Sequence, residues 1–223
     1  MGIICGVDEA GRGPVIGPMV IAIVCVEEEN VEKLQSIGVR DSKELEPYQR
    51  AKLSILIREV SKYLNYIIVQ PEEIDRYVVM NKLNVLEAEK TAALIQEALR
   101  HVENIELVIV DSPDVNPERY ARHIKALLLS RGLSCNVLAE HKADRKYPVV
   151  AAASIVAKHV RDMEIEKLKQ TYGDFGSGYP SDPRTLKFLI EYLRKHGTLP
   201  PIVRKTWSTV QRVLREFRQT KLF

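Results

Sequence analysis

The sequence predicts an α/β protein, in which a mixed sheet of five strands is flanked by helices and followed by a small helical C-terminal domain. Five short runs rich in Ile, Val and Leu are typical of buried strands, at residues 3–8, 19–26, 64–69, 106–111 and 135–140. Amphipathic patterns long enough for helices fill most of the gaps, at residues 47–62, 83–102, 117–131, 147–171 and 182–196. A chain of 223 residues, 45% of them hydrophobic, can bury a sizeable core around such a sheet.

The order of these elements predicts how the strands pair. A glycine-rich turn joins the first two strands directly, which indicates an antiparallel hairpin. The strands at residues 106–111 and 135–140 are joined through a helix, which favours parallel pairing. Two helices have clear starts, because Asn116-Pro117 and Asp182-Pro183 each place a capping side chain before a proline at the first helical position.

Glycines and charge divide the chain near its C-terminal quarter. A glycine-rich break at residues 172–178 predicts a first domain of residues 1–172 and a basic helical domain of residues 173–223. The whole chain has a net charge of only +3, but residues 184–223 hold ten Lys or Arg against two acids, Glu191 and Glu216. This asymmetry indicates a polyanionic partner held by the basic domain, the alternative being an ordinary solvated surface.

The cysteines and the longest apolar run bear on cellular location. Cys5, Cys25 and Cys135 each lie in an apolar run without metal-ligand spacing, and we expect all three to be small buried hydrophobic residues. The apolar run at residues 14–26 is broken by Gly and Pro, is too short to cross a bilayer and follows no charged leader. We therefore expect a cytoplasmic protein.

Carboxylates stand at the ends of three predicted strands. Asp8 and Glu9 end the first strand, Asp111 ends the fourth, and Asp144 follows the fifth just ahead of a helix. Ligands gather outside the carboxyl ends of strands in an open α/β sheet, so neighbouring strands would bring these four acids together. Turn or helix caps are the alternative explanation for Asp111 and Asp144. Two nearby acids are rivals for their roles, Glu140 and Asp114.

Converging carboxylates repel one another unless cations neutralise them, so this pattern predicts a metal site. Oxygen ligands without His or Cys favour Mg²⁺ or Mn²⁺ over zinc. Consecutive strand residues point to opposite faces, so Asp8 and Glu9 would not both reach one metal unless the chain twists near Gly11 or one acts through backbone or water.

The turn Gly11-Arg12-Gly13 has two interpretations. Glycines are ordinary in tight turns, but around an arginine they also let backbone groups approach a ligand closely. The stretch is not a P-loop, because no Lys-Ser/Thr follows, and it does not open a helix as a dinucleotide motif does.

These motifs together resemble ribonuclease HII, and specifically its archaeal branch. The matching stretches cover residues 7–14 with Gly17-Pro18, residues 40–43 (Arg-Asp-Ser-Lys), Asp111-Ser112, residues 141–162 (HKADRKYPVVAAASIVAKHVRD) and residues 176–182. The resemblance implies a ribonuclease H-like fold and cleavage of the RNA strand of RNA/DNA hybrids, including the 5′ side of single ribonucleotides embedded in duplex DNA, leaving 3′-hydroxyl and 5′-phosphate ends. A role in removing ribonucleotides and RNA primers follows from it.

The resemblance also implies roles for individual residues. Two Mg²⁺ or Mn²⁺ ions would be held by the family's four catalytic carboxylates, which match Asp8, Glu9, Asp111 and Asp144. The backbone of Gly11-Arg12-Gly13 matches the element that senses the ribose 2′-hydroxyl. Tyr179 matches a tyrosine that packs on the ribonucleotide sugar, its alternative being loop packing, and Lys43 matches a lysine near the substrate phosphates.

Two rival functions follow from the same residues. A non-catalytic nucleic-acid-binding module would use only the basic domain, and a resolvase- or transposase-like nuclease would use the same acids on DNA. A sliding clamp is a further candidate partner, although residues 211–217 and 221–223 match a clamp-binding peptide poorly. We expect a monomer.

Overall fold

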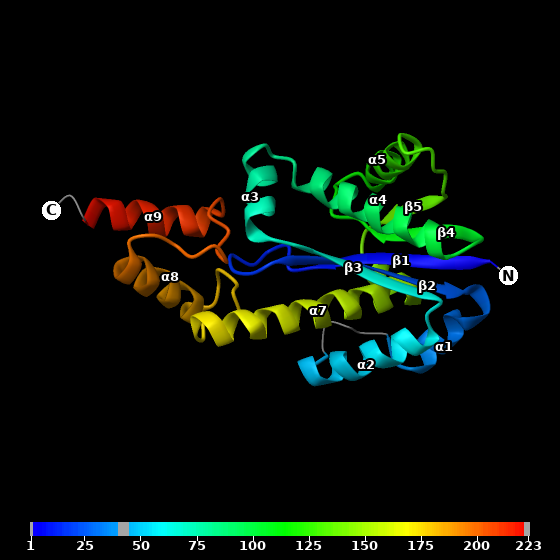
Figure 1. The fold of residues 1–223 in the computed structure, drawn as a ribbon, viewed down its shortest axis with the longest axis horizontal. Coiled ribbons are helices and arrows are strands. Elements are labelled where there is room, and N and C mark those ends of the chain that lie inside the picture. The colour runs from blue at the N-terminus through cyan, green and yellow to red at the C-terminus, as the bar shows by residue number, and fades with distance from the viewer. Residues whose placement is uncertain (1, 40–44, 221–223) are drawn as a thin grey trace. The chain divides into compact units, whose positions relative to one another are not determined.

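The computed structural model describes residues 2–39 and 45–220. Within them five strands form one sheet in the order β3-β2-β1-β4-β5 (Figure 1). The strands are β1 (Ile3–Ala10), β2 (Met19–Glu27), β3 (Tyr63–Val69), β4 (Ile105–Asp111) and β5 (Val137–Glu140). The predicted mixed α/β sheet is therefore confirmed. Of the predicted site residues, Lys43 lies outside the described residues.

The pairing of the strands follows the prediction from their connections. β1 and β2 are antiparallel from Ile3↔Glu27 to Ala10↔Val20, as expected for strands joined by a short turn. β4 pairs in parallel with β1 and with β5, and the helix α5 (Pro117–Leu129) makes the connection from β4 to β5. The carboxyl ends of these three parallel strands consequently meet at one edge of the sheet.

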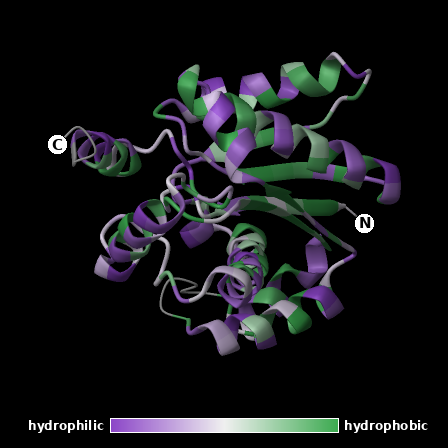
Figure 2. Ribbon diagram, turned by 60° about the vertical axis from the view of Figure 1, so that its left-hand side comes forward, coloured by the Kyte–Doolittle hydropathy of each residue, from purple (hydrophilic) through white to green (hydrophobic). Residues whose placement is uncertain are grey.

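Helices cover both faces of the sheet. One face packs on α1 (Val31–Ser36), α2 (Pro47–Val60) and the first half of α7 (Pro148–Tyr172), through a core that includes Val24, Ile57 and Val150. α4 (Leu83–His101) and α5 lie on the other face (Figure 1). The strands are almost uniformly hydrophobic while the helices show both colours (Figure 2), as expected for a sheet covered on both faces.

The chain divides into two compact units. The first comprises Met1–Ala10, Val20–Ile68 and Asn84–Val160, and the second Gly11–Met19, Val69–Leu83 and Arg161–Phe223. The second unit has its own hydrophobic core, to which α8 (Pro183–His196) contributes Leu189 and α9 (Ser208–Thr220) contributes Val210. The described residues from 173 onward belong to this unit, together with three segments from earlier in the chain.

Several short elements have no counterpart among the predicted ones. They are the 3₁₀ turn Glu28–Asn30, α1, α3 (Pro71–Val79) and α6 (Ala143–Lys146). Most are too short for an amphipathic period to repeat. The longer helix α9 lies in the predicted basic helical domain but outside every predicted helix range. In the described part of the chain no helix is both long enough and apolar enough to span a membrane.

The cysteines differ from the prediction. Cys5 and Cys25 are fully buried as expected, but they are directly paired across β1 and β2 and form a disulfide. Cys135 precedes β5 and is only partly buried. Pairing of two cysteines depends on strand register, and a hydrophobic pattern does not report the register by itself.

The predicted cap of α5 offers a test of its local stability. The Asn116 side-chain oxygen accepts a hydrogen bond from the backbone N–H of Arg119 (2.9 Å). We expect Asn116→Ala to lower the unfolding free energy by about 1 kcal/mol, or roughly 2–4 °C in Tm, because this N–H loses its partner. Thermal unfolding monitored by circular dichroism checks this, and Asn116→Ser, which keeps a capping oxygen, should recover most of the loss.

Candidate functional site

Acidic residues lie level with one another at the carboxyl edge of the parallel strands. The pairing of β1 with β4 ends at Val7↔Val110, so Asp8 and Asp111 occupy equivalent positions one residue further along. β4 in turn pairs Asp111 with Glu140 on β5. Residues in register project to the same face of a sheet, which brings Asp8 and Asp111 together.

Three carboxylates form a compact cluster at this edge. One oxygen each from Asp8, Glu9 and Asp111 lies within 4.8 Å of the others. Asp8 and Glu9 thus contribute to one cluster, as predicted, although they are consecutive residues of a strand that stays paired with β2 as far as Ala10. The pairing of β1 with β4 ends at Val7, so the two acids lie just beyond the part of β1 that β4 covers.

Asp8 is the most buried acid of the cluster, with only 6% of its surface exposed. Its Oδ1 accepts a hydrogen bond from the backbone N–H of Glu9 (2.8 Å), and the buried hydroxyl of Ser154 on α7 is a second partner. Burial, and after it the charges of Glu9 and Asp111, raises the pKa of Asp8 well above its ordinary value. Sequence reasoning missed Ser154, since one serine in an alanine-rich helix gives no signal.

Asp111 is oriented by the turn that follows β5. Its Oδ1 accepts a hydrogen bond from the backbone N–H of Ala143, the first residue of α6 (2.6 Å). The sequence suggested a local turn or helix cap for Asp111 as the alternative, whereas this contact reaches a residue 32 positions later in the chain. Asp144 is the next residue of α6 and is partly buried, but within the described residues it is not one of the three acids gathered within 4.8 Å.

The two rival acids have partners of their own. Glu140 accepts hydrogen bonds from Lys146 and from the hydroxyl of Tyr147 (2.6 Å), which together lower its pKa. Asp114 accepts from the Arg119 guanidinium and from the backbone N–H of Asn116. Neither belongs to the three-acid cluster found among the described residues.

The donor set of the cluster fits a hard divalent cation. All three ligand atoms are carboxylate oxygens, which Mg²⁺ and Mn²⁺ prefer. Burial raises the pKa of Asp8 most, and the charges of Glu9 and Asp111 raise it further; a divalent cation would offset both effects by favouring the ionised carboxylates.

The glycine loop, defined here as residues 11–17, lies in the second unit. Gly11 has φ of +88°, and a Cβ there would come within 2.3 Å of the Arg161 Nε atom, so only glycine fits. Arg161 is buried and donates to the backbone carbonyl oxygens of Pro18 (3.2 Å) and Ile16 (3.4 Å). These hydrogen bonds, one to Ile16 in the loop and one to Pro18 just after it, help to hold the loop in place.

Tyr179 stands beside the other end of the Gly-Arg-Gly turn. Its side chain is 42% exposed, its ring centroid is 5.9 Å from the Arg161 guanidinium carbon, and its ring edge would lie 3.6 Å from a Cβ at Gly13. The ring thus keeps an accessible surface next to the loop.

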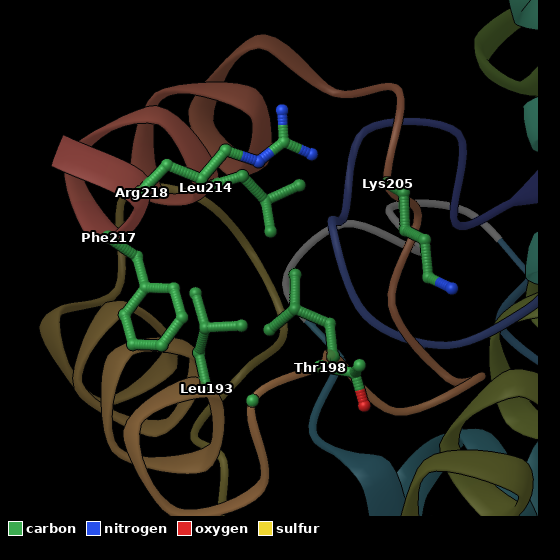
Figure 3. A pocket seen from close by; sticks show the side chains of 8 residues that line it. Leu193, Thr198, Lys205, Leu214, Phe217 and Arg218 are labelled. Carbon is green, nitrogen blue, oxygen red and sulfur yellow. The ribbon is translucent and has the colours of Figure 1, made fainter. Parts of the chain in front are cut away.

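A separate apolar pocket of about 580 Å³ lies between α8 and α9. Figure 3 shows the side chains of Leu193, Leu214 and Phe217 gathered in it, with Lys205 and Arg218 also lining it. The described residues that line this pocket include no carboxylate, so it is not a second candidate metal site.

Comparison with known proteins decides the family. The family model described as "Ribonuclease HII" matches residues 5–210. This chain belongs to the ribonuclease HII family. It is accordingly a ribonuclease H enzyme, and the two rival functions, a non-catalytic module and a resolvase-like nuclease, are set aside.

Individual ribonucleases HII are similar over almost their whole length. The protein of Thermofilum pendens is 51% identical over 96% of this chain and 100% of its own. The crystal structure of the ribonuclease H2 from Pyrococcus horikoshii OT3 superposes with a TM-score of 0.87 at 50% identity, covering 97% of this chain and 99% of the other. The Archaeoglobus fulgidus ribonuclease HII, solved in complex with PCNA, has a TM-score of 0.82 at 43% identity, covering 94% and 96%.

Proposed function

We propose that this ribonuclease HII hydrolyses the RNA strand of RNA/DNA hybrids and cuts on the 5′ side of ribonucleotides embedded in duplex DNA, leaving 3′-hydroxyl and 5′-phosphate ends. The observation that carries the proposal is the cluster of Asp8, Glu9 and Asp111 at the carboxyl edge of the sheet in a chain of this family. Its biological role would be removal of misplaced ribonucleotides and RNA primers in the cytoplasm.

We propose that Asp8, Glu9 and Asp111 hold Mg²⁺ or Mn²⁺, with two ions per site and with Asp144 as the fourth ligand. Bound metal would activate water and stabilise the charge that develops on the leaving 3′-oxygen. The protein's own part is to keep these acids in place: Ser154 and the Glu9 backbone N–H orient Asp8, and the Ala143 N–H orients Asp111.

The glycine loop and Tyr179 are proposed to recognise the ribonucleotide. The 2′-hydroxyl is the group that distinguishes a ribonucleotide from its deoxy neighbours, and backbone groups at Gly11-Arg12-Gly13 can approach it because the glycines carry no side chain. The exposed ring of Tyr179 would pack on the sugar. The proposed contact of Lys43 with a substrate phosphate rests on the match to the family motif alone.

Gly13→Ala tests the role of the loop with little effect on folding. Gly13 has φ outside the left-handed region, and a Cβ there would only touch the Tyr179 ring at 3.6 Å. We expect Tm to change by less than about 2 °C and the preference for a ribonucleotide-containing duplex over an all-DNA duplex to fall about tenfold, because the methyl group would occupy the proposed sugar contact. The ratio of the two Kd values in EDTA measures this, and an unchanged ratio would remove Gly13 from the site.

We propose that residues 173–223 grip the duplex backbone through their basic side chains, which predicts salt-dependent binding. A sliding clamp is a further proposed partner, supported by the PCNA complex of the Archaeoglobus fulgidus relative.

The decisive experiment uses duplex DNA with one internal ribonucleotide beside an all-DNA duplex of the same sequence, each with Mg²⁺, with Mn²⁺ and with EDTA. Metal-dependent cutting at the 5′ side of the ribonucleotide alone supports the proposal. Cutting of the all-DNA duplex, or cutting in EDTA, would contradict it.

A further inference from the structure

Two side chains of the second unit hold the carbonyl groups of the glycine loop. The Arg204 guanidinium donates to the carbonyl oxygens of Gly11 (2.6 Å), Arg12 (3.0 Å) and Gly17 (3.0 Å). The indole N–H of Trp207 donates to the carbonyl oxygen of Gly13 (3.2 Å). Each carbonyl of the Gly-Arg-Gly turn therefore has its own side-chain donor.

The position of the Arg204 guanidinium is restricted by burial and by the Trp207 ring. Its surface is fully buried, so its charge depends on these hydrogen bonds for compensation. Its guanidinium also lies 5.0 Å from the centre of the Trp207 ring, a distance at which cation and ring attract each other. Three separate nitrogens of the planar guanidinium reach the three carbonyls, whereas the three N–H groups of lysine all lie on one nitrogen atom.

The hydrogen bonds from Arg204 to these carbonyls fix the direction in which the neighbouring N–H groups point. In a trans peptide the C=O and the N–H of the next residue point in opposite directions. Because the carbonyls of Gly11 and Arg12 point to Arg204, the N–H groups of Arg12 and Gly13 point away from it. The loop thereby presents two backbone donors on the side opposite the arginine.

The segment that carries these side chains is itself anchored. Asp75 on α3 accepts hydrogen bonds from the backbone N–H groups of Lys205 (2.7 Å) and Thr206 (3.1 Å). The backbone N–H of Arg204 donates to the carbonyl of Val15 (2.8 Å), inside the glycine loop. Residues 204–207 and the loop therefore form one connected polar network in the second unit.

We propose that Arg204 and Trp207 are positioning residues for ribonucleotide selectivity. By holding the three peptide planes of the Gly-Arg-Gly turn, they aim the N–H groups of Arg12 and Gly13 at a 2′-hydroxyl oxygen. This inference rests on the proposed function, which assigns 2′-hydroxyl sensing to the loop, and adds to it the side chains that set the geometry of the sensor.

The test compares Arg204→Lys and Trp207→Phe with the wild type. Kd is measured in EDTA for a duplex with one ribonucleotide and for the all-DNA duplex of the same sequence, and selectivity is the ratio of the two. We expect selectivity to fall at least about fivefold in Arg204→Lys and about two- to threefold in Trp207→Phe, with Kd for the all-DNA duplex unchanged. Phe217→Leu, in the pocket between α8 and α9, is the control for general destabilisation and should keep full selectivity.

Unchanged selectivity in both variants would overturn the proposal, and so would an equal weakening of binding to both duplexes, which is the mark of a merely structural role. If Arg204→Lys does not fold, Trp207→Phe decides alone, because it keeps an aromatic ring, although a smaller one, and removes the indole N–H donor. Selectivity that is lost in Gly13→Ala but intact in Arg204→Lys and Trp207→Phe refutes the positioning role and leaves the proposed function standing. A wild-type protein that does not distinguish the duplexes refutes the proposed function, and the inference with it.

Discussion

Asp8→Asn should lower kcat for a ribonucleotide-containing duplex by a factor of about 10³ or more, because it removes the most buried charge of the proposed metal-binding cluster. Binding of the duplex in EDTA should be unchanged or tighter, since one negative charge near a polyanion is gone. Single-turnover cleavage in Mg²⁺ and a binding titration in EDTA measure the two effects. An Asp8→Asn enzyme with ordinary activity would refute the role of this acid.

Glu140→Gln is the matched control, because Glu140 lies level with Asp111 on the next strand but is hydrogen-bonded to Lys146 and Tyr147. Its cleavage rate should stay within a few-fold of wild type.

Asp8→Asn should also change how the stability of the protein depends on pH. The pKa of Asp8 is raised in the folded protein, so its contribution to stability is present below the ordinary carboxyl pKa of about 4 and is lost as the pH rises through the raised value. Asn carries no charge and escapes this loss. In EDTA, the Tm of Asp8→Asn minus that of wild type should therefore grow as the pH rises above the ordinary carboxyl pKa of about 4.

Gly6→Ala should destabilise the first unit by about 3 kcal/mol or more, or roughly 6–12 °C in Tm. A Cβ at Gly6 would lie 2.2–2.4 Å from backbone atoms of Val149 and Val150, so β1 and the start of α7 would have to separate. Activity should fall as well, because β1 carries Asp8 and Glu9, and α7 carries Ser154, the partner of Asp8. Thermal unfolding and cleavage assays measure both losses.

Gly2→Ala is the control for Gly6→Ala, because it distinguishes crowding against backbone atoms from the loss of a glycine in itself. The atoms nearest to a Cβ at Gly2 belong to the carboxyl end of the Glu106 side chain, which can rotate away. Its Tm should stay close to that of wild type, and a similar loss in both variants would contradict the packing argument.

The sheet and the long helices could be predicted because their signals are local. Short runs of Ile, Val and Leu report the strands and period-3.6 patterns report the helices, and Asn116 and Asp182 accept the capping hydrogen bonds that their sequence context predicted. The cluster of Asp8 and Asp111 was also predictable, because both acids end strands of the same sheet.

The contacts of Arg204 could not be predicted, because its acceptors are backbone carbonyls. Gly11, Arg12 and Gly17 lie 187 to 193 residues earlier, and a carbonyl has no sequence signature. A basic residue in a basic segment suggests a solvated or phosphate-binding side chain, whereas this one is fully buried. Arg161 is another buried arginine whose acceptors are backbone carbonyls far away in the sequence.

The pairing of Glu140 with Lys146 shows how the edge of the sheet distributes its counter-charges. Lys146 is a permanent counter-ion, tied to the chain a few residues after the carboxylate it neutralises. For Asp8, Glu9 and Asp111, an exchangeable divalent cation would serve the same purpose. Removing Lys146 would leave Glu140 as an additional uncompensated negative charge beside Asp111, so this lysine limits how much positive charge the edge recruits from solution.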